Sequence, residues 1–278
     1  MIIDLVVPYV DMTDPKWLKK ANDNNILISK NRFRGQGDFF KYFFRCVAKN
    51  MAWINNIFLI VQSKSQVPKW INLDKVTVVL HSDFIPRQFL PVYNSCTIEM
   101  FLHKIPNLSE HFLYANDDLY VMKKVNPINF FSQNKVKQNF ISNHNENHVC
   151  GKINANGFKQ VYNKEFSFKP EHALKPLLKS KYEECFNKYK KEIYNSITTT
   201  RSSQNFNVYL FVYYLDFLGL SERSSLSFKI FCCWDMSAFI KIKDIVCIND
   251  NLDINIYEDK RLNERFENLF SEKSKYEM

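Results

Sequence analysis

Short apolar runs alternate with amphipathic segments through the first half of the chain. Residues 38–52 repeat apolar side chains at helical spacing, and Pro15 after Asp14 is typical of a helix start. We expect a strand in each of five apolar runs, at residues 2–10, 57–61, 76–80, 112–115 and 119–122. Alternating strands and helices predict an α/β fold with a mostly parallel central sheet and helices on its faces.

The second half has a weaker pattern. Residues 132–165 are polar with little periodicity, which favours loops, whereas residues 170–195 and 204–218 look helical. We expect a strand at 244–248 and an amphipathic helix at 255–270. This predicts a core at 1–131, a loop and helical region at 132–230, and a return to the core at 231–278.

Two polar clusters follow predicted strands, at Asp11–Asp14 and at Asn116–Asp118. Ligands of such sheets bind at the carboxyl ends of the strands. The paired carboxylates of Asp117 and Asp118 suit a hard divalent cation, Mg²⁺, Mn²⁺ or Ca²⁺. From spacing alone a tight turn is the favoured explanation for Asn116–Asp118, and helix capping is the favoured explanation for Asp14.

Three further places offer weaker signals. Asn249 and Asp250 follow the strand at 244–248, where a turn is the simpler explanation. A histidine such as His172 can act as a general base, although a lone histidine is more often structural. Arg201 follows three threonines and could bind phosphate oxygens, or could be an ordinary surface arginine. Arg34 belongs to a basic group near the first loop.

Composition and motifs limit the classes of function that the chain can have. The net charge of +9 is compatible with nucleic acid, an anionic membrane surface, phosphorylated substrates or simply a lysine-rich surface. No nucleic-acid motif is present, and neither are the motifs of P-loop kinases, α/β hydrolases and zinc hydrolases. Seven scattered cysteines without a CxxC pair, and no signal peptide or membrane span, predict a cytoplasmic protein.

Taken in order along the chain, these signals resemble the Stealth family in four blocks. The first is IDLVVPYVDMTDP at 3–15, with Met12 in place of the family's usual glycine. The second runs through 32–122, from RFR to the Asn116–Asp118 turn, although the acid that usually follows RFR is absent. The third includes HALKPLLKS from His172 and the Arg201-Ser202 pair, and the fourth includes VCIND and LFSEKSKYE.

The resemblance implies a core similar to type A glycosyltransferases with an added helical subdomain. It implies transfer of a hexose 1-phosphate from a UDP-N-acetylhexosamine or UDP-hexose to a saccharide or lipid-linked saccharide, with a divalent metal. The implied catalytic residues are His172, Arg201 and Asp117. Metal ligands would come from Asp117, Asp118 and Asp250, and substrate contacts from Asp11, Asp14, Arg34, Asn94, Asn116 and Asn249.

Two other functions stay open at this point. A glycosyltransferase on the same scaffold would need the same donor and metal but would release UDP instead of UMP. A sugar-binding protein without catalysis would not need His172, Arg201 and both acidic turns together. The basic charge also leaves peripheral association with the inner face of a membrane as an open alternative, whereas we expect no nucleic-acid partner.

Overall fold

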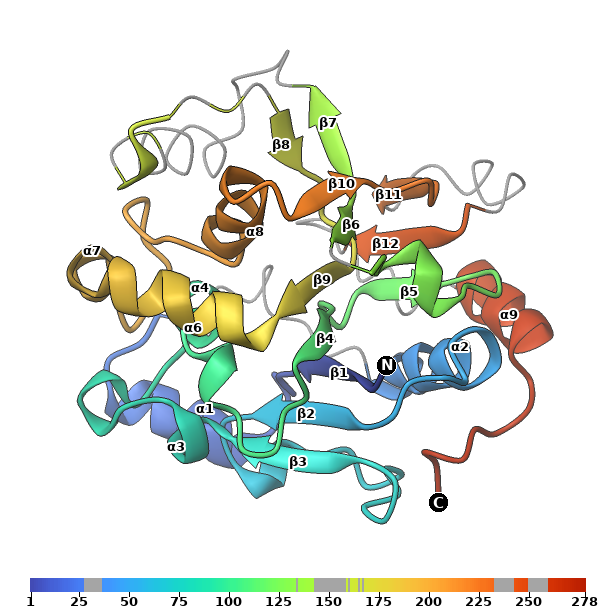
Figure 1. Cartoon of the computed structure of the whole chain (residues 1–278). Helices are drawn as coiled ribbons and strands as arrows, with labels where there is room; N and C mark the ends of the chain where they lie inside the picture. Colours follow the sequence, from blue (N-terminus) through green and yellow to red (C-terminus); the bar gives the residue numbers. More distant parts are fainter. Residues whose placement is uncertain are drawn as a thin grey trace.

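The computed structural model describes residues 1–27, 37–133, 135–142, 159, 161–164, 166, 168–232, 243–249 and 260–278. A five-stranded sheet has the order β3-β2-β1-β4-β9 (Figure 1). Its first four strands are parallel and the last is antiparallel, which confirms the mostly parallel α/β prediction. The strands are β1 (Ile3–Pro8), β2 (Ile57–Val61), β3 (Thr77–Leu80), β4 (His111–Tyr114) and β9 (Lys175–Leu178).

Helices cover this sheet where the sequence predicts them. Helix α1 (Pro15–Asp23) begins after Asp14, whose side chain accepts a hydrogen bond from the Lys16 amide. Helix α2 (Lys41–Asn50) continues from the 3₁₀ helix η1 (Gly37–Phe40) and buries its aromatic face. Shorter helices join the remaining strands: η2 (Lys64–Gln66), α3 (His81–Phe84), η3 (Arg87–Phe89), α4 (Ser95–Glu99), η4 (Leu102–Lys104) and η5 (Pro127–Asn129).

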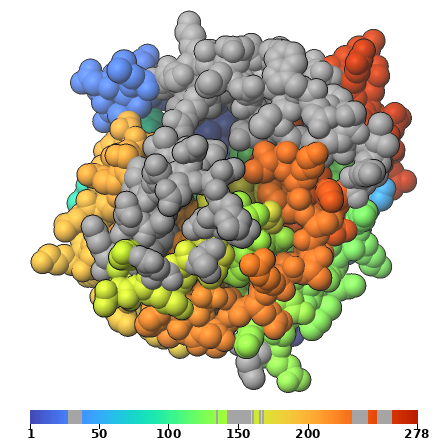
Figure 2. All heavy atoms as spheres, turned by 90° about the horizontal axis from the view of Figure 1, so that it is seen from above, coloured from blue at the N-terminus to red at the C-terminus, as the bar shows by residue number. Residues whose placement is uncertain are grey.

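Smaller sheets lie above the central one. Strands β11 (Phe228–Cys232), β12 (Ile245–Asn249) and β5 (Leu119–Val121) form one of them. Strand β6 (Val136–Gln138) pairs with β10 (Ser221–Arg223), and β7 (Phe140–Ser142) pairs with β8 (Phe168–Pro170). In Figure 2 the late orange segments accordingly lie against the earlier green ones.

The second half differs from its prediction in two places. The segment 170–195 is not one helix, because β9 precedes α6 (Lys179–Lys188) and α7 (Lys190–Ser196). Pairing with β4 buries most of β9, and this tertiary contact overrides the local pattern. The region 132–165 was predicted as loops, yet it contains β6 and β7. The predicted helix at 204–218 is the shorter α8 (Tyr209–Phe217).

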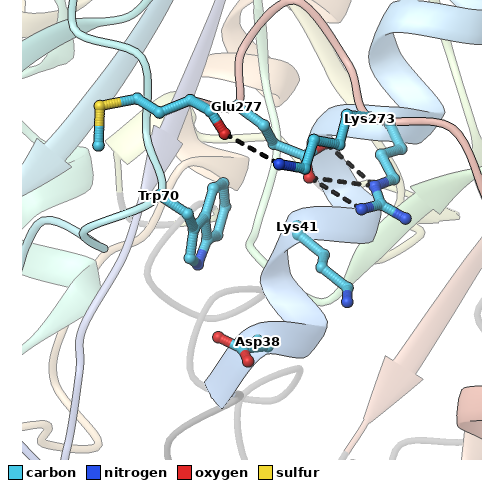
Figure 3. A pocket seen from close by; sticks show the side chains of 7 residues that line it. Asp38, Lys41, Trp70, Lys273 and Glu277 are labelled. Atoms are coloured by element: carbon cyan, nitrogen blue, oxygen red, sulfur yellow. Dashed lines mark hydrogen bonds and ion pairs between the residues drawn. The ribbon is translucent and has the colours of Figure 1, made fainter.

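The C-terminal segment returns to α2. Helix α9 (Lys260–Leu269) packs Phe266 against Phe39 and Tyr42, and a bidentate ion pair joins Arg45 to Glu277 at 2.9 Å. Figure 3 shows Glu277 and Lys273 beside Lys41 and Trp70, around a small cavity next to α2. One hydrophobic cluster takes residues from all three predicted regions, whose boundaries stay predictions.

Candidate functional site

The register between β4 and β9 brings two distant segments together. Leu113 pairs with Pro176 and Tyr114 with Lys175. Continued beyond the strands, this antiparallel register carries the turn after β4 and the loop before β9 to the same edge of the sheet. There Nε2 of His172 lies 3.4 Å from Oδ1 of Asp118. Two of the predicted site residues therefore meet.

The two carboxylates of the turn repel each other. Burial, together with the charge of Asp118, raises the pKa of Asp117 to about 8. Oδ1 of Asp118 is buried and accepts no hydrogen bond from any described residue. Repelling carboxylates with an unsatisfied oxygen fit a divalent cation, which would neutralise their charge. The donors present are therefore compatible with the predicted metal.

Strand β12 adds a third potential ligand. Sγ of Cys247 donates a hydrogen bond to Oδ2 of Asp118 at 3.3 Å, and ligand atoms of Asp118, His172 and Cys247 lie within 4.8 Å of one another. The sequence analysis did not single out Cys247, because a cysteine in an apolar strand is usually a small core residue. Its position two residues before Asn249, a predicted substrate contact, was the one sequence feature that pointed to a role for Cys247.

Strand β12 also places Asn249. The Ile248 amide donates to the Asp118 carbonyl at 2.9 Å, so the end of β12 lies beside the acidic turn. Asn249 is the last residue of β12. Its side chain, together with the predicted residues Asp250 and Arg34, lies outside the described part of the chain.

The end of β1 carries a second group of acids. Strand β1 runs parallel to β4, with Val6 paired to Tyr114, so the residues that follow the two strands lie at the same edge of the sheet. Burial and the charges of Asp11, Asp117 and Asp38 raise the pKa of Tyr9. Asp11 accepts hydrogen bonds from the Thr13 amide and hydroxyl at 2.8 and 2.7 Å. The first block of the sequence and the Asn116–Asp118 turn therefore end at the same edge of the sheet.

Asp14 lies in the protein interior beside this edge. It is 7% exposed, caps α1, and accepts hydrogen bonds from Ser65 and Gln66 at 2.6 and 2.8 Å. Burial acts to raise the pKa of Asp14, but these hydrogen bonds lower it below its usual value. The capping role expected for Asp14 is present.

Arg201 and Asn94 lie where the threonine run at 198–200 contacts the start of α4. Nη2 of Arg201 donates to Oγ of Ser95 at 2.7 Å, and the guanidinium is exposed. Asn94 is 2% exposed, and its amide donates to the side chain of Asn205 at 3.0 Å and to backbone carbonyls of the threonine run. Asn94 therefore fixes the segment that carries Arg201.

Glu99, the last residue of α4, contacts Tyr114 at the end of the strand that precedes the acidic turn. Sequence reasoning did not assign Glu99 a role. Its carboxylate accepts hydrogen bonds from the Tyr114 hydroxyl and the Val208 amide, both at 2.8 Å. Burial raises the pKa of Glu99, whereas these hydrogen bonds and the charges of Arg201 and His172 act to lower it. Glu99 is therefore held in the interior by Tyr114 and Val208, and the charges of Arg201 and His172 act on it.

Comparison with known proteins identifies the family. The family model described as Stealth protein CR2, conserved region 2, matches residues 32–139. The capsular polysaccharide phosphotransferase cps1A of Actinobacillus pleuropneumoniae is 31% identical over 243 residues, which cover 78% of this chain and 66% of that protein. The capsular polysaccharide phosphotransferase LcbA of Aeromonas hydrophila is 34% identical over 69% of this chain and 58% of its own length.

The exopolysaccharide phosphotransferase cps2G of Lactiplantibacillus plantarum is 41% identical over 47% of this chain and 40% of its own. The chain thus spans 66% or less of these three relatives. A solved structure of the galactosyltransferase LgtC, in complex with donor and acceptor sugar analogues, covers 96% of this chain and 95% of its own with a TM-score of 0.48 and 11% identity. So distant a match adds no argument about function.

Proposed function

Because the chain belongs to the Stealth family, we propose that it is a phosphotransferase that moves a hexose 1-phosphate from a UDP-sugar onto a sugar hydroxyl. The acceptor would be a saccharide or lipid-linked saccharide in polysaccharide synthesis at the cell surface. The observation that carries this proposal is the meeting of His172 with Asp118 at the carboxyl edge of the sheet. Named relatives act as capsular or exopolysaccharide phosphotransferases, which supports the reaction class.

The proposed reaction exchanges one phosphorus–oxygen bond for another. The acceptor hydroxyl oxygen attacks the β-phosphorus of the UDP-sugar, and the bond from this phosphorus to the bridging oxygen breaks. UMP leaves with the electron pair, and the hydroxyl proton passes to a base on the protein. The sugar keeps its anomeric configuration because no bond to its anomeric carbon breaks.

His172 is the proposed base. Its Nε2 faces Asp118 at 3.4 Å, and the side chain is 35% exposed, so an acceptor can reach the ring from solvent. In the proposed tautomer the hydrogen is on Nε2, the nitrogen nearer Asp118, and Nδ1 holds the free electron pair that accepts the proton. Asp118 then orients the ring and stabilises the imidazolium that forms, as an acid does in a catalytic triad.

Asp117 and Asp118 are the proposed cation ligands, with Asp250 completing the set. Asn116 and Asn249 directly precede Asp117 and Asp250 in the chain and are the proposed substrate contacts beside the cation. When bound, Mg²⁺ or Mn²⁺ would neutralise the diphosphate and the developing charge on the leaving group. Removing the cation with a chelator should abolish transfer, and adding Mg²⁺ or Mn²⁺ back should restore it.

Arg201 is the proposed partner of the phosphoryl oxygens. Its guanidinium is exposed, and the hydrogen bond to Ser95 uses only one of its nitrogens, which leaves other N–H groups for an anion. Arg34 would add a second positive charge. Asp11 and Asp14 would shape the donor loop after β1, and Asn94 would act through the segment that carries Arg201.

The released nucleotide tests the proposal. The protein is incubated with a panel of UDP-sugars, Mg²⁺ or Mn²⁺ and a saccharide acceptor, and the nucleotide is identified by mass spectrometry. UMP is the expected product. UDP would instead establish an ordinary glycosyltransferase, and turnover no higher than that of the His172→Ala variant would favour a binding protein. We expect His172→Ala to slow transfer by about 10²–10⁴-fold, the usual contribution of a general base.

A further inference from the structure

The loop that carries His172 is short of regular hydrogen bonds. Residues 171–174 lie between β8 and β9 and belong to neither strand. Ala173 and Leu174 are each 3% exposed, so the carbonyl groups of this loop cannot all rely on water. Buried carbonyls without a donor are strongly disfavoured, and the loop therefore needs donors from elsewhere in the protein.

Lys175 supplies those donors. It is 3% exposed, and its Nζ donates to the carbonyl of Glu171 and, at 2.6 Å, to the carbonyl of Ala173. Nζ also lies 5.3 Å from the centre of the Tyr209 ring, a favourable position for a cation. Because an enclosed amino group, charged or neutral, is unfavourable without hydrogen-bond partners, the lysine and the two carbonyls depend on each other.

The two carbonyls flank His172 in the sequence. One nitrogen atom therefore holds the peptide group between Glu171 and His172 and the peptide group between Ala173 and Leu174, and this nitrogen belongs to the first residue of β9. Strand β9 is fixed to β4 through the pairing of Lys175 with Tyr114. The result is a rigid connection from the sheet to the backbone on either side of His172, whose Nε2 then lies 3.4 Å from Asp118.

We propose that Lys175 is a positioning residue that holds the imidazole of His172 against Asp118 by binding the carbonyls of Glu171 and Ala173. The importance of the imidazole position for catalysis rests on the proposed function, whereas the location of the ring beside Asp118 does not. Lys175 acts through the loop and accepts no proton from the substrate. A substitution should therefore lower the catalytic rate more than it weakens donor binding.

The test compares Lys175→Met with Lys179→Met in the full chain. Lys179 is a matched control because its Nζ also donates to a backbone carbonyl, that of Leu108 at 3.2 Å, away from His172. Histidine ring signals are recorded by NMR, and the His172 signal is assigned from its absence in His172→Gln. We expect Lys175→Met to shift or broaden this signal while those of His81, His103 and His111 stay unchanged.

The kinetic arm uses the same proteins. We expect kcat of Lys175→Met to fall by roughly 10²-fold, because a small displacement of a catalytic group has effects of this size. KM for the UDP-sugar should change by less than about threefold, because the substitution leaves in place the interactions that bind the donor equally in the ground state and the transition state. Lys179→Met should match the wild type in its His172 signal and in kcat.

An unmoved His172 signal together with wild-type kcat in Lys175→Met overturns the proposal. Should Lys175→Met unfold, which would displace every histidine signal, Lys175→Gln decides instead. Its amide can reach one carbonyl, so a partial effect on the His172 signal and on kcat is expected, and wild-type behaviour refutes the role. Failure of the wild type to transfer hexose phosphate would remove the proposed function but leave the NMR arm intact.

Discussion

Removal of the Glu277 side chain should destabilise the protein substantially. The Arg45 side chain is 7% exposed and that of Glu277 only 5%. Three hydrogen bonds join the two groups, at 2.9, 3.0 and 3.2 Å. Breaking a buried pair by removing one partner has an effect of about 3–5 kcal/mol, because the remaining charge stays buried. Arg45 keeps the carbonyl of Phe270 and an ion pair with the half-exposed Glu267 at 3.5 Å, so we expect the lower end, about 3 kcal/mol, for Glu277→Ala.

Urea unfolding measures this free energy directly. The exposed Glu272 provides the control, and Glu272→Ala should stay within about 0.5 kcal/mol of the wild type. The double variant Arg45→Met/Glu277→Leu should recover to within about 1 kcal/mol, because it leaves no buried unpaired charge and Glu267, the other partner of Arg45, is half exposed. A loss below about 1 kcal/mol in Glu277→Ala, or a double variant whose loss equals the sum of the single ones, would refute the reasoning.

Three further predictions concern the site. Burial lowers the pKa of Lys175 to about 7, against charges of Glu171 and Glu99 that act to raise it, so the unfolded chain binds an extra proton above pH 7. Stability should therefore rise from about pH 7 to 9, a rise that Lys175→Met should lack in urea titrations. Cd²⁺ should give a sulfur–cadmium absorption band in the wild type but not in Cys247→Ser, and a band in both would place the thiol away from the cation. Asp14→Ala should lose about 1–2 kcal/mol in urea, Asp14→Ser clearly less, and equal losses would argue against capping.

The central sheet was predictable because its strands are marked locally. The wholly apolar run at 57–61 is β2 with the same bounds, and Pro15 begins α1 as expected. Strand β9 was not predictable in this way. Its residues Lys175–Leu178 continue into a charged helix, and only the pairing with β4, far away in the sequence, makes them a strand.

The candidate site was predictable to a similar extent. Asp118 and His172 were selected from the order of motifs, and the structure brings them together. Cys247 and Glu99 could not be selected from residue type, because a buried cysteine usually packs and an acid usually faces solvent. Their importance follows from contacts with Asp118, Tyr114 and Val208, and these contacts depend on the complete fold.

The pairing of β7 with β8 determines where the chain can tolerate changes in length. Phe140 pairs with Pro170, so the two ends of the segment between these strands lie side by side. A change of length before Tyr162 leaves these paired ends in place and has a small effect on loop-closure entropy, whereas Tyr162 itself is buried and donates to the Leu210 carbonyl. The stretch from Pro170 to Lys175 has no such freedom, since a single inserted residue would separate the imidazole from its carboxylate.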